Sequence, residues 1–351
     1  MQQPATDEVL IRREGRAGRI TMNRPKALNA LTYAMVAPIW DALQAWKDDP
    51  AVELVLLEGA GERGLCAGGD VRSLYESRTA GSGLARAFWR DEYRLNALIS
   101  RYPKPYVALQ DGIVMGGGIG LSSHGSHRVV TERSQLAMPE TGIGLIPDVG
   151  GTWLLANAPG EVGIYLGLTG ETMHAADAIY ARFSDALVPS SRLPALVDRL
   201  VDAGGGPVGD AIRGLAEDAG QSELARRRDV IDAALAGDGV ERMHMGLAGI
   251  PEEWAAKARA ALGQKSPKAL KLTLAAIRHA RRLASLEEAL KQEYRLAVRL
   301  FEDGEFPEGV RALLIDKDRK PRWSPPSLGE VPDALVMGYL APLPAEEELM
   351  F

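Results

Sequence analysis

The sequence predicts an α/β fold that ends in a helical region, and two observations support this prediction. Over roughly the first 190 residues, short apolar runs are followed by glycine-containing turns and then by amphipathic stretches, which is typical of recurring strand–turn–helix units. Beyond Gly151, long stretches rich in Ala, Leu, Arg and Glu carry apolar residues at helical spacing. Strands are therefore expected first and helices last.

The N-terminal half supplies the predicted strands. Residues Val9–Arg13 and Arg19–Met22 are expected to pair around a glycine-containing turn. Thr32 is expected to cap a helix that ends near Asp48. The other expected elements are strands at Leu54–Leu57 and Pro105–Leu109, helices at Leu84–Ile99 and Gly117–Ser122, and short strands at Val129–Val130 and Leu136–Ala137 that share one sheet.

The C-terminal half is predicted to be helical. Ser266 and Ser285 stand where helices are expected to begin, because a serine hydroxyl accepts hydrogen bonds from the free N–H groups of a first turn. From Phe306 onward the apolar spacing is irregular and proline is frequent, which predicts a tail. The helices are expected at residues 191–203, 221–236, 252–262, 267–284 and 285–302.

Composition and charge argue against several classes of function. The chain has 351 residues and a net charge of -6, which disfavours non-specific binding to nucleic acid. No apolar run approaches the ~20 residues of a membrane helix, and the polar N-terminal stretch lacks the apolar region of a signal peptide. Cys66 is the single cysteine, so neither an intrachain disulfide nor a Cys/His zinc centre is expected. These features predict a cytoplasmic protein without a membrane or nucleic-acid partner.

Two glycine-rich segments, each near the end of a predicted strand, are candidates for binding a negatively charged oxygen. Residues 64–70 have the sequence GLCAGGD, and Gly116–Gly118 form a second cluster. The backbone N–H groups of Gly69 and Gly117 are expected to form an oxyanion hole, because glycine lets a carbonyl group approach the backbone. The alternative for a glycine cluster taken alone is an ordinary turn. A dinucleotide fingerprint is excluded, because the G-x-G-x-x-G spacing is absent.

Two carboxylates follow in unusually apolar surroundings. Glu140 and Asp148 have Met138, Ile146 and Val149 among their neighbours. Burial in such surroundings raises the pKa of a carboxyl group, which is typical of acids that act as a base or nucleophile. The alternatives are structural roles, in which Glu140 caps a turn and Asp148 caps a helix that begins near Val149.

Four motifs together resemble the crotonase (enoyl-CoA hydratase/isomerase) superfamily. They are NRPKALNAL at 23–31, GLCAGGD at 64–70, GIVMGGGIGL at 112–121 and MPETGIGLIPDVGGT at 138–152. Similarity in the C-terminal half, including EYRLA at 293–297, extends the resemblance over nearly the whole chain. It implies a crotonase-like spiral of repeated ββα units over residues 1–195, with the catalytic and CoA-binding residues, and a helical C-terminal region with a tail over 196–351.

The resemblance also implies roles for individual residues. It places the oxyanion hole on Gly69 and Gly117, in agreement with the glycine pattern. Glu140 and Asp148 match the acids that act on the thioester. Glu92 matches an acid that contacts the substrate, and its alternative is a solvated position on a helix face. The residues implied to contact coenzyme A are Lys26, Ala27, Arg63, Arg72 and Lys317.

Two positions favour the hydrolase branch of the superfamily. Hydratases that resemble this chain hold water with two glutamates, of which one matches Glu140 and the other falls at Gly120, and they carry glycine where this chain has Asp148. The match is closest to the 3-hydroxyisobutyryl-CoA hydrolases, which implies hydrolysis of a small branched 3-hydroxyacyl-CoA in valine breakdown. Glu140 would then attack the thioester to form an anhydride, or activate a water, and the sequence leaves both open.

The resemblance implies that no metal or redox cofactor takes part, since coenzyme A belongs to the substrate. It leaves a homo-oligomer open. Two other functions stay as alternatives: an enoyl-CoA hydratase or isomerase, and a non-catalytic scaffold that binds acyl-CoA.

Overall fold

The structure is a computed structural model that describes residues 7–351. The chain forms two compact units, and each is assembled from separate parts of the sequence. The first unit contains the described residues up to 70 together with 94–136 and 173–223. The second contains 71–93, 137–172 and 224–351. The division into residues 1–195 and 196–351 stays a prediction.

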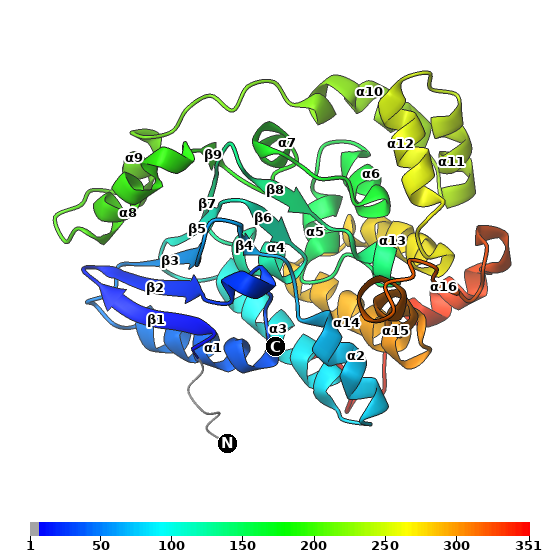
Figure 1. The fold of residues 1–351 in the computed structure, drawn as a ribbon, viewed down its shortest axis with the longest axis horizontal. Helices are drawn as coiled ribbons and strands as arrows, with labels where there is room; N and C mark the ends of the chain where they lie inside the picture. Colours follow the sequence, from blue (N-terminus) through cyan, green and yellow to red (C-terminus); the bar gives the residue numbers. More distant parts are fainter. Residues whose placement is uncertain (1–6) are drawn as a thin grey trace. The chain divides into compact units, whose positions relative to one another are not determined.

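The first unit is built around a six-stranded sheet with the order β1-β2-β3-β5-β7-β9 (Figure 1). β1 and β2 pair antiparallel, as predicted, and every later pair of neighbours is parallel. β5 is buried along its whole length, which explains why its sequence is mostly apolar instead of alternating. The strands are β1 Val9–Glu14, β2 Ala17–Met22, β3 Leu54–Gly59, β5 Tyr106–Gln110, β7 His127–Val130 and β9 Ala186–Leu187.

A second sheet has three strands in the order β4-β6-β8, with β4 at Gly64–Cys66, β6 at Ile113–Met115 and β8 at Gln135–Ala137. Successive strands alternate between the two sheets. The first strand of each pair lies in the six-stranded sheet and the second in the three-stranded sheet, for β3 and β4, β5 and β6, and β7 and β8. The chain therefore winds as a spiral of repeated units. The prediction that Val129–Val130 and Leu136–Ala137 share a sheet is wrong. Between them the N–H of Thr131 donates to Oγ of Ser134 at 2.7 Å, and this turn directs the chain into the other sheet.

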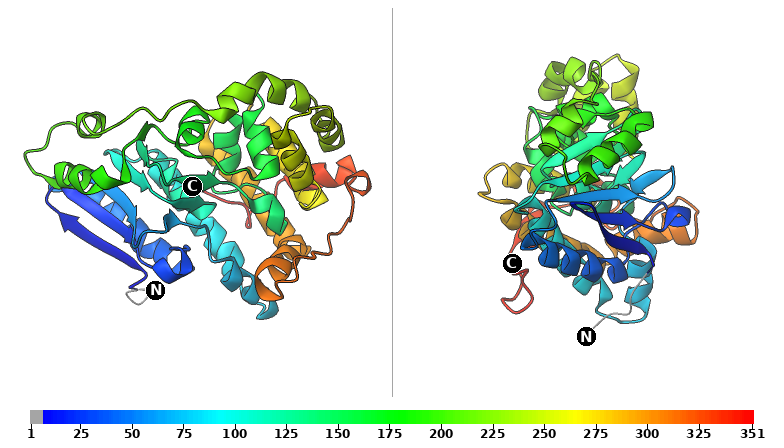
Figure 2. Two further views of the ribbon diagram at one scale, coloured as in Figure 1. Left: turned by 45° about the horizontal axis from the view of Figure 1, so that its top comes forward. Right: turned by 90° about the vertical axis from the view of Figure 1, so that its left-hand side faces the viewer.

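Helices α8 and α9 pack against the six-stranded sheet within the first unit (Figure 2). Leu196 and Leu200 of α8 and Ile212 of α9 belong to one buried apolar cluster with Leu56 and Val107 of the sheet. Burial of this apolar face is the main stabilising term for such packing. The α-helices of this unit are α1 Tyr33–Lys47, residues 94–100 of α3 Leu84–Ser100, α4 Gly117–Ser122, α7 Ala175–Tyr180, α8 Leu193–Val201 and α9 Val208–Arg213.

The second unit is mainly helical. The predicted tail from Phe306 is partly wrong, because it contains most of α15, a π-helix at Arg311–Ile315, and α16. These helices are too short to show a clear period in the sequence. The helices of this unit are α2 Val71–Thr79, residues 84–93 of α3 Leu84–Ser100, α5 Gly151–Ala156, α6 Val162–Thr169, α10 Glu223–Leu235, α11 Val240–Ala248, α12 Glu253–Leu262, α13 Pro267–Ala280, α14 Leu286–Glu302, α15 Glu305–Val310 and α16 Asp333–Leu340.

Three predicted helix starts are confirmed. Thr32 is the N-cap residue of α1. Oγ of Ser266 accepts a hydrogen bond from the N–H of Ala269 at 3.0 Å at the start of α13. Oγ of Ser285 accepts one from the N–H of Glu288 at 3.4 Å at the start of α14. Each serine satisfies a backbone donor that has no partner inside its helix.

Candidate active site

The two predicted oxyanion donors belong to the first unit and lie on loops that follow strands of the small sheet. Gly69 comes shortly after β4, and Gly117 follows β6 and is the first residue of α4. The first N–H groups of a helix have no acceptor within the helix. Within residues 7–351, no hydrogen bond from either amide to another residue is found. Both amides are therefore available to bind an oxygen atom.

Glycine is required where these two loops approach each other. A Cβ at Gly118 would lie 2.3 Å from the carbonyl oxygen of Cys66. Gly68 has a φ of +114°, a conformation that side chains rarely adopt, and a Cβ there would lie 3.9 Å from the nitrogen of Gly117. The two glycine motifs therefore lie side by side. Cys66, within the first motif, is buried as a small packed residue.

Asn29, which the sequence analysis does not single out, fixes the loop that precedes α1. Its side-chain N–H groups donate to the carbonyl oxygens of Ala60 and Gly64, both at 2.9 Å. Its side-chain oxygen accepts from the N–H of Arg24 at 2.8 Å. Residues 23–31 are thereby tied to the residues that lead into the GLCAGGD loop. A buried side-chain amide needs hydrogen-bond partners, so the asparagine among the apolar residues of NRPKALNAL was the available signal of this structural role.

Glu92, Glu140 and Asp148, here called the acid cluster, all belong to the second unit. All three are buried, with exposed fractions of 2%, 6% and 5%. A solvated position for Glu92 on its helix α3 is therefore excluded. The helix-capping role considered for Asp148 is also wrong, because α5 begins at Gly151 and Gly150 is its N-cap residue. Glu140 is the first residue of a short 3-10 helix.

Part of the acid cluster lacks hydrogen bonds. The hydroxyl of Tyr93 donates to Oδ2 of Asp148 at 2.7 Å. In the part of the chain that the structure describes, Oε1 of Glu92 and Oε2 of Glu140 are buried without a hydrogen-bond partner. Buried polar atoms are nearly always paired, so these two oxygens are free to accept a hydrogen bond from a bound molecule.

Burial raises the pKa of each acid in the cluster, and repulsion by Asp148 adds to this rise at Glu92 and Glu140. Burial raises the pKa of Asp148 to about 6, although the hydrogen bond from Tyr93 counters this effect. Burial, and then the charge of Asp148, raise the pKa of Glu140 and of Glu92 well above the usual value. The positive charge of Lys265 acts in the opposite direction on the pKa of Glu140. Such shifts are typical of acids that exchange protons or attack a substrate.

A fourth buried acid, Glu293 on α14, is absent from the sequence-based prediction. Its side chain has an exposed fraction of 0%. It accepts hydrogen bonds from the N–H groups of Gly150 at 2.6 Å and Thr152 at 2.9 Å, and from the Thr152 hydroxyl. Burial raises the pKa of Glu293 to about 8. The available signal was an acid within the EYRLA stretch, among apolar residues at helical spacing.

The five residues predicted to contact coenzyme A are all exposed. The first unit contains Lys26, Ala27 and Arg63, and the second contains Arg72 and Lys317. Arg72 also donates a hydrogen bond to the carbonyl oxygen of Leu314 at 3.1 Å. Contact with coenzyme A stays a prediction for each of them.

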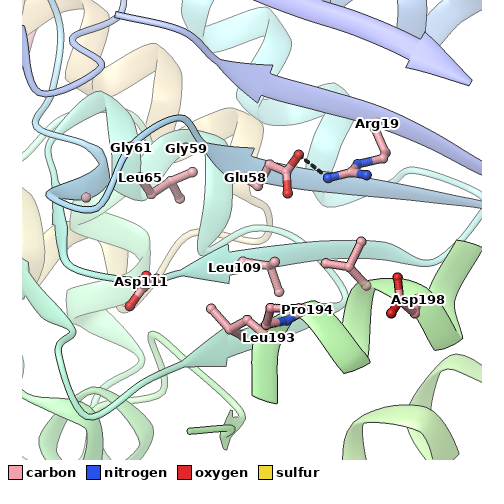
Figure 3. Close-up of a pocket in the computed structure, with 12 residues that line it drawn as sticks. Arg19, Glu58, Gly59, Gly61, Leu65, Leu109, Asp111, Leu193, Pro194 and Asp198 are labelled. Atoms are coloured by element: carbon pink, nitrogen blue, oxygen red, sulfur yellow. Dashed lines mark hydrogen bonds and ion pairs between the residues drawn. The ribbon is translucent and has the colours of Figure 1, made fainter. Parts of the chain in front are cut away.

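A cavity of about 360 Å³ in the first unit is lined by other residues (Figure 3). Arg19 and Glu58, which form an ion pair at 2.6 Å, line it together with Asp111 and residues of α8. Neither Gly69 nor Gly117 is among the lining residues. The cavity is therefore distinct from the predicted oxyanion donors.

Comparison with known sequences identifies relatives over almost the full length of the chain. Residues 17–340 match the family model of enoyl-CoA hydratase/isomerase. A Danio rerio protein named 3-hydroxyisobutyryl-CoA hydrolase, mitochondrial, is 41% identical over 344 residues, which are 96% of this chain and 90% of the relative. The Homo sapiens protein of the same name is 39% identical over 336 residues, with coverage of 93% and 86%.

Two solved structures are similar to this one throughout. A structure described as a carnitinyl-CoA dehydratase from Mycobacterium thermoresistibile has a TM-score of 0.93 and 46% identity, and covers 99% of each chain. A structure described as an enoyl-CoA hydratase from Rhodobacter sphaeroides 2.4.1 has a TM-score of 0.92 and 44% identity, and covers 98% of this chain and 100% of its own. The chain therefore belongs to the enoyl-CoA hydratase/isomerase family and has the crotonase fold.

Proposed function

We propose that this protein hydrolyses a small branched 3-hydroxyacyl-CoA, specifically 3-hydroxyisobutyryl-CoA, to 3-hydroxyisobutyrate and coenzyme A, as a step of valine breakdown. The observation that carries the proposal is the burial of Glu140 and Asp148 with raised pKa values, while one oxygen of Glu140 has no partner among the described residues. Relatives that are 39% and 41% identical carry the name of this hydrolase.

In the proposed reaction the N–H groups of Gly69 and Gly117 bind the thioester oxygen. They stabilise the negative charge that develops there, and the loss of one such donor costs about 2.7–4 kcal/mol. The carboxylate of Glu140 attacks the thioester carbon, the carbon–sulfur bond breaks, and coenzyme A leaves as a thiolate. Water then cleaves the mixed anhydride, which regenerates the carboxylate of Glu140 and releases the carboxylate of the hydroxy acid together with two protons, one of which neutralises the thiolate.

A second route uses the same residues without a covalent intermediate. Here Glu140 takes a proton from a water molecule as that water attacks the thioester carbon. The carbon–sulfur bond then breaks, and the proton held by Glu140 neutralises the departing thiolate of coenzyme A. In both routes Asp148, with Glu92, accepts a hydrogen bond from the 3-hydroxyl group of the substrate or holds the water. Neither route needs a metal or redox cofactor, since coenzyme A is part of the substrate.

Trapping the acyl-enzyme distinguishes the two routes. Hydroxylamine added during turnover converts a mixed anhydride at Glu140 into a hydroxamate, which peptide mass spectrometry locates. A modified Glu140 that forms only in the presence of substrate supports the anhydride. An unmodified Glu140, with no hydroxamate of the acyl group beyond the amount formed without enzyme, favours the water route.

Hydration of an enoyl-CoA is the second candidate function, because the two solved structures above are described as a hydratase and a dehydratase. Against this function, the chain lacks the second of the two glutamates with which hydratases hold the attacking water. In this chain Gly120 stands at the corresponding position within α4 and has no side chain. Glu140 alone would have to hold the water and transfer its proton.

One pair of assays separates these functions. Release of free thiol from a panel of 3-hydroxyacyl-CoA thioesters measures hydrolysis, and the loss of ultraviolet absorbance of crotonyl-CoA measures hydration. We expect thiol release, fastest with the branched 3-hydroxy substrate, and little hydration. Rapid hydration without thiol release would refute the proposal and support the hydratase.

A non-catalytic scaffold is tested with Glu140→Gln and a matched control, Glu76→Gln, on an exposed position of α2. The proposal predicts that Glu140→Gln lowers kcat at least about a hundredfold, whereas the control keeps its activity. A scaffold predicts the same background rate for both variants and for the unchanged protein.

The proposal extends to the cellular compartment of the protein and to its oligomeric state. Among residues 7–351, no helix combines the length and apolar character needed to cross a bilayer. The single cysteine favours a reducing compartment, for which we propose the cytoplasm, whereas the relatives above are named mitochondrial. A homo-oligomer stays a prediction, which light scattering at several protein concentrations tests.

A further inference from the structure

Val149, the residue after Asp148, has an unfavourable backbone conformation. Its φ is +53°, and the following Gly150 has a φ of +80°. A β-branched side chain makes positive φ costly, and such outliers persist only where the surroundings enforce them. Val149 is also buried, with an exposed fraction of 1%. Something in the second unit therefore holds this segment in a form that its own sequence disfavours.

The carboxylate of Glu293 supplies that restraint. Oε2 accepts from the N–H of Gly150 at 2.6 Å, and Oε1 accepts from the N–H of Thr152 at 2.9 Å and from the Thr152 hydroxyl. Both oxygens are engaged, so the side chain fixes the backbone on the C-terminal side of Val149.

The same helix also contacts the residue that holds the side chain of Asp148. The hydroxyl of Tyr93 donates to Asp148, and the ring of Tyr93 packs edge-on against that of Tyr294, with centroids 6.3 Å apart. Tyr294 is the neighbour of Glu293 on α14. α14 therefore restrains the backbone after Asp148 directly and its carboxyl group through Tyr93.

We propose that Glu293 is a positioning residue, which holds residues 148–152 in the strained conformation that directs Asp148 toward Tyr93 and the acid cluster. A role limited to stability is the alternative. A buried acid is a costly way to satisfy two backbone amides, because a serine or asparagine commonly does so at a helix start. The inference rests on the proposed function, because positioning of Asp148 has a catalytic consequence only if Asp148 acts on the substrate.

The variant Glu293→Gln tests the restraint with little change in size. Each oxygen of Glu293 accepts from a backbone N–H, so glutamine must turn its own NH2 group toward one of these donors. We expect kcat to fall about tenfold to a hundredfold, as for a small displacement of a catalytic group, with a much smaller change in KM. Glu305→Gln is the matched control, because Glu305 is another buried acid of this unit that contacts Ser266 and Lys268 instead. Its kcat should stay unchanged.

Rescue distinguishes positioning from stability. Val149→Gly removes the cost of positive φ, so the double variant Glu293→Gln with Val149→Gly should recover most of the lost kcat, to within about threefold of the unchanged protein. Val149→Gly alone removes buried apolar surface and should lower the unfolding midpoint. Recovery of kcat in a less stable protein therefore supports positioning, whereas a kcat that follows the unfolding midpoint across the variants refutes it.

Hydrogen exchange tests the restraint without an activity assay. Peptides covering residues 148–152 should exchange their amide hydrogens faster in Glu293→Gln than in Glu305→Gln at equal global stability. Equal exchange in the two variants overturns the restraint itself. Faster exchange in a protein that releases no thiol from any 3-hydroxyacyl-CoA would instead leave the restraint intact and refute the proposed function.

Discussion

Burying several carboxyl groups close together costs folding free energy, because each loses hydration and each repels the charge of the next. This cost applies to the acid cluster of the second unit, because Glu92, Glu140 and Asp148 are almost fully buried. Residues retained at such a cost are expected to serve function more than stability. Substitution of one of them should therefore separate the two properties.

Asp148→Asn is predicted to stabilise the protein while reducing hydrolysis. Its pKa is about 6 in the folded state against an ordinary value of 3.8, so the folded state binds more protons between these values. The cost of ionisation is therefore absent below the unfolded value and fully present above about pH 6, where it amounts to about 3 kcal/mol. Asparagine avoids this cost and still accepts the Tyr93 hydrogen bond.

Urea unfolding at two pH values checks this prediction. The variant should exceed the unchanged protein in unfolding free energy near neutral pH, and the difference should vanish as the pH falls below the ordinary value of 3.8. Thiol release should fall about a hundredfold or more. An equal difference in unfolding free energy at both pH values would show that the ionisation of Asp148 is not its cause.

The pH dependence of kcat/KM should reflect the same repulsion. Glu140 must be ionised either to attack the thioester or to accept a proton, and burial together with the charge of Asp148 raises its pKa. The rate is therefore expected to rise with pH over a range above the ordinary value of 4.5. In Asp148→Asn the residual activity should rise at lower pH, since one source of repulsion is removed. If kcat/KM of Asp148→Asn rises over the same pH range as that of the unchanged protein, the ionisation of Glu140 does not control this rise.

At the scale of elements, the predictions succeeded where short apolar runs and capping residues define local structure. The β1–β2 pair, α4 at Gly117–Ser122 and the serine starts of α13 and α14 are local features, and all are confirmed. The assignment of strands to sheets failed, because the turn at Thr131–Ser134 depends on a side-chain hydrogen bond that residue spacing does not reveal. Apolar neighbours were enough to predict Glu140 and Asp148, and the family resemblance indicated Glu92, whereas Glu293 and Asn29 depend on partners far along the chain.

The packing of α8 on the six-stranded sheet should be a major source of stability in the first unit. Leu196 lies on α8 with an exposed fraction of 0% and belongs to the apolar cluster. Leu196→Ala should lower the unfolding free energy by about 2–5 kcal/mol, through lost burial and the cavity that remains. Leu10→Ala on β1 is the control, because Leu10 is exposed and its loss should change stability by no more than about 0.5 kcal/mol. Similar values for the two variants would show that α8 is not essential to this core.

At the scale of the whole molecule, an acidic protein is predicted to bind an anionic substrate. The net charge of -6 repels coenzyme A at long range, so local cations have to offset it. Lys26→Gln and Arg63→Gln are each expected to raise KM by up to about fivefold without changing kcat, as for exposed ion pairs. The effect should shrink at high salt. Arg13→Gln, an exposed cation on β1, is the control, and an equal rise of KM in all three variants would refute local contacts at residues 26 and 63.

The passage of the chain back and forth between the two sheets limits how proteins of this architecture can change in length. Removing one interior turn of the spiral would take a strand from the middle of both sheets and leave two interrupted hydrogen-bond ladders. Residues added beyond the last turn disturb neither ladder. Evolutionary insertions and deletions are therefore expected to accumulate at the ends and in the connecting segments, while the number of interior turns stays constant.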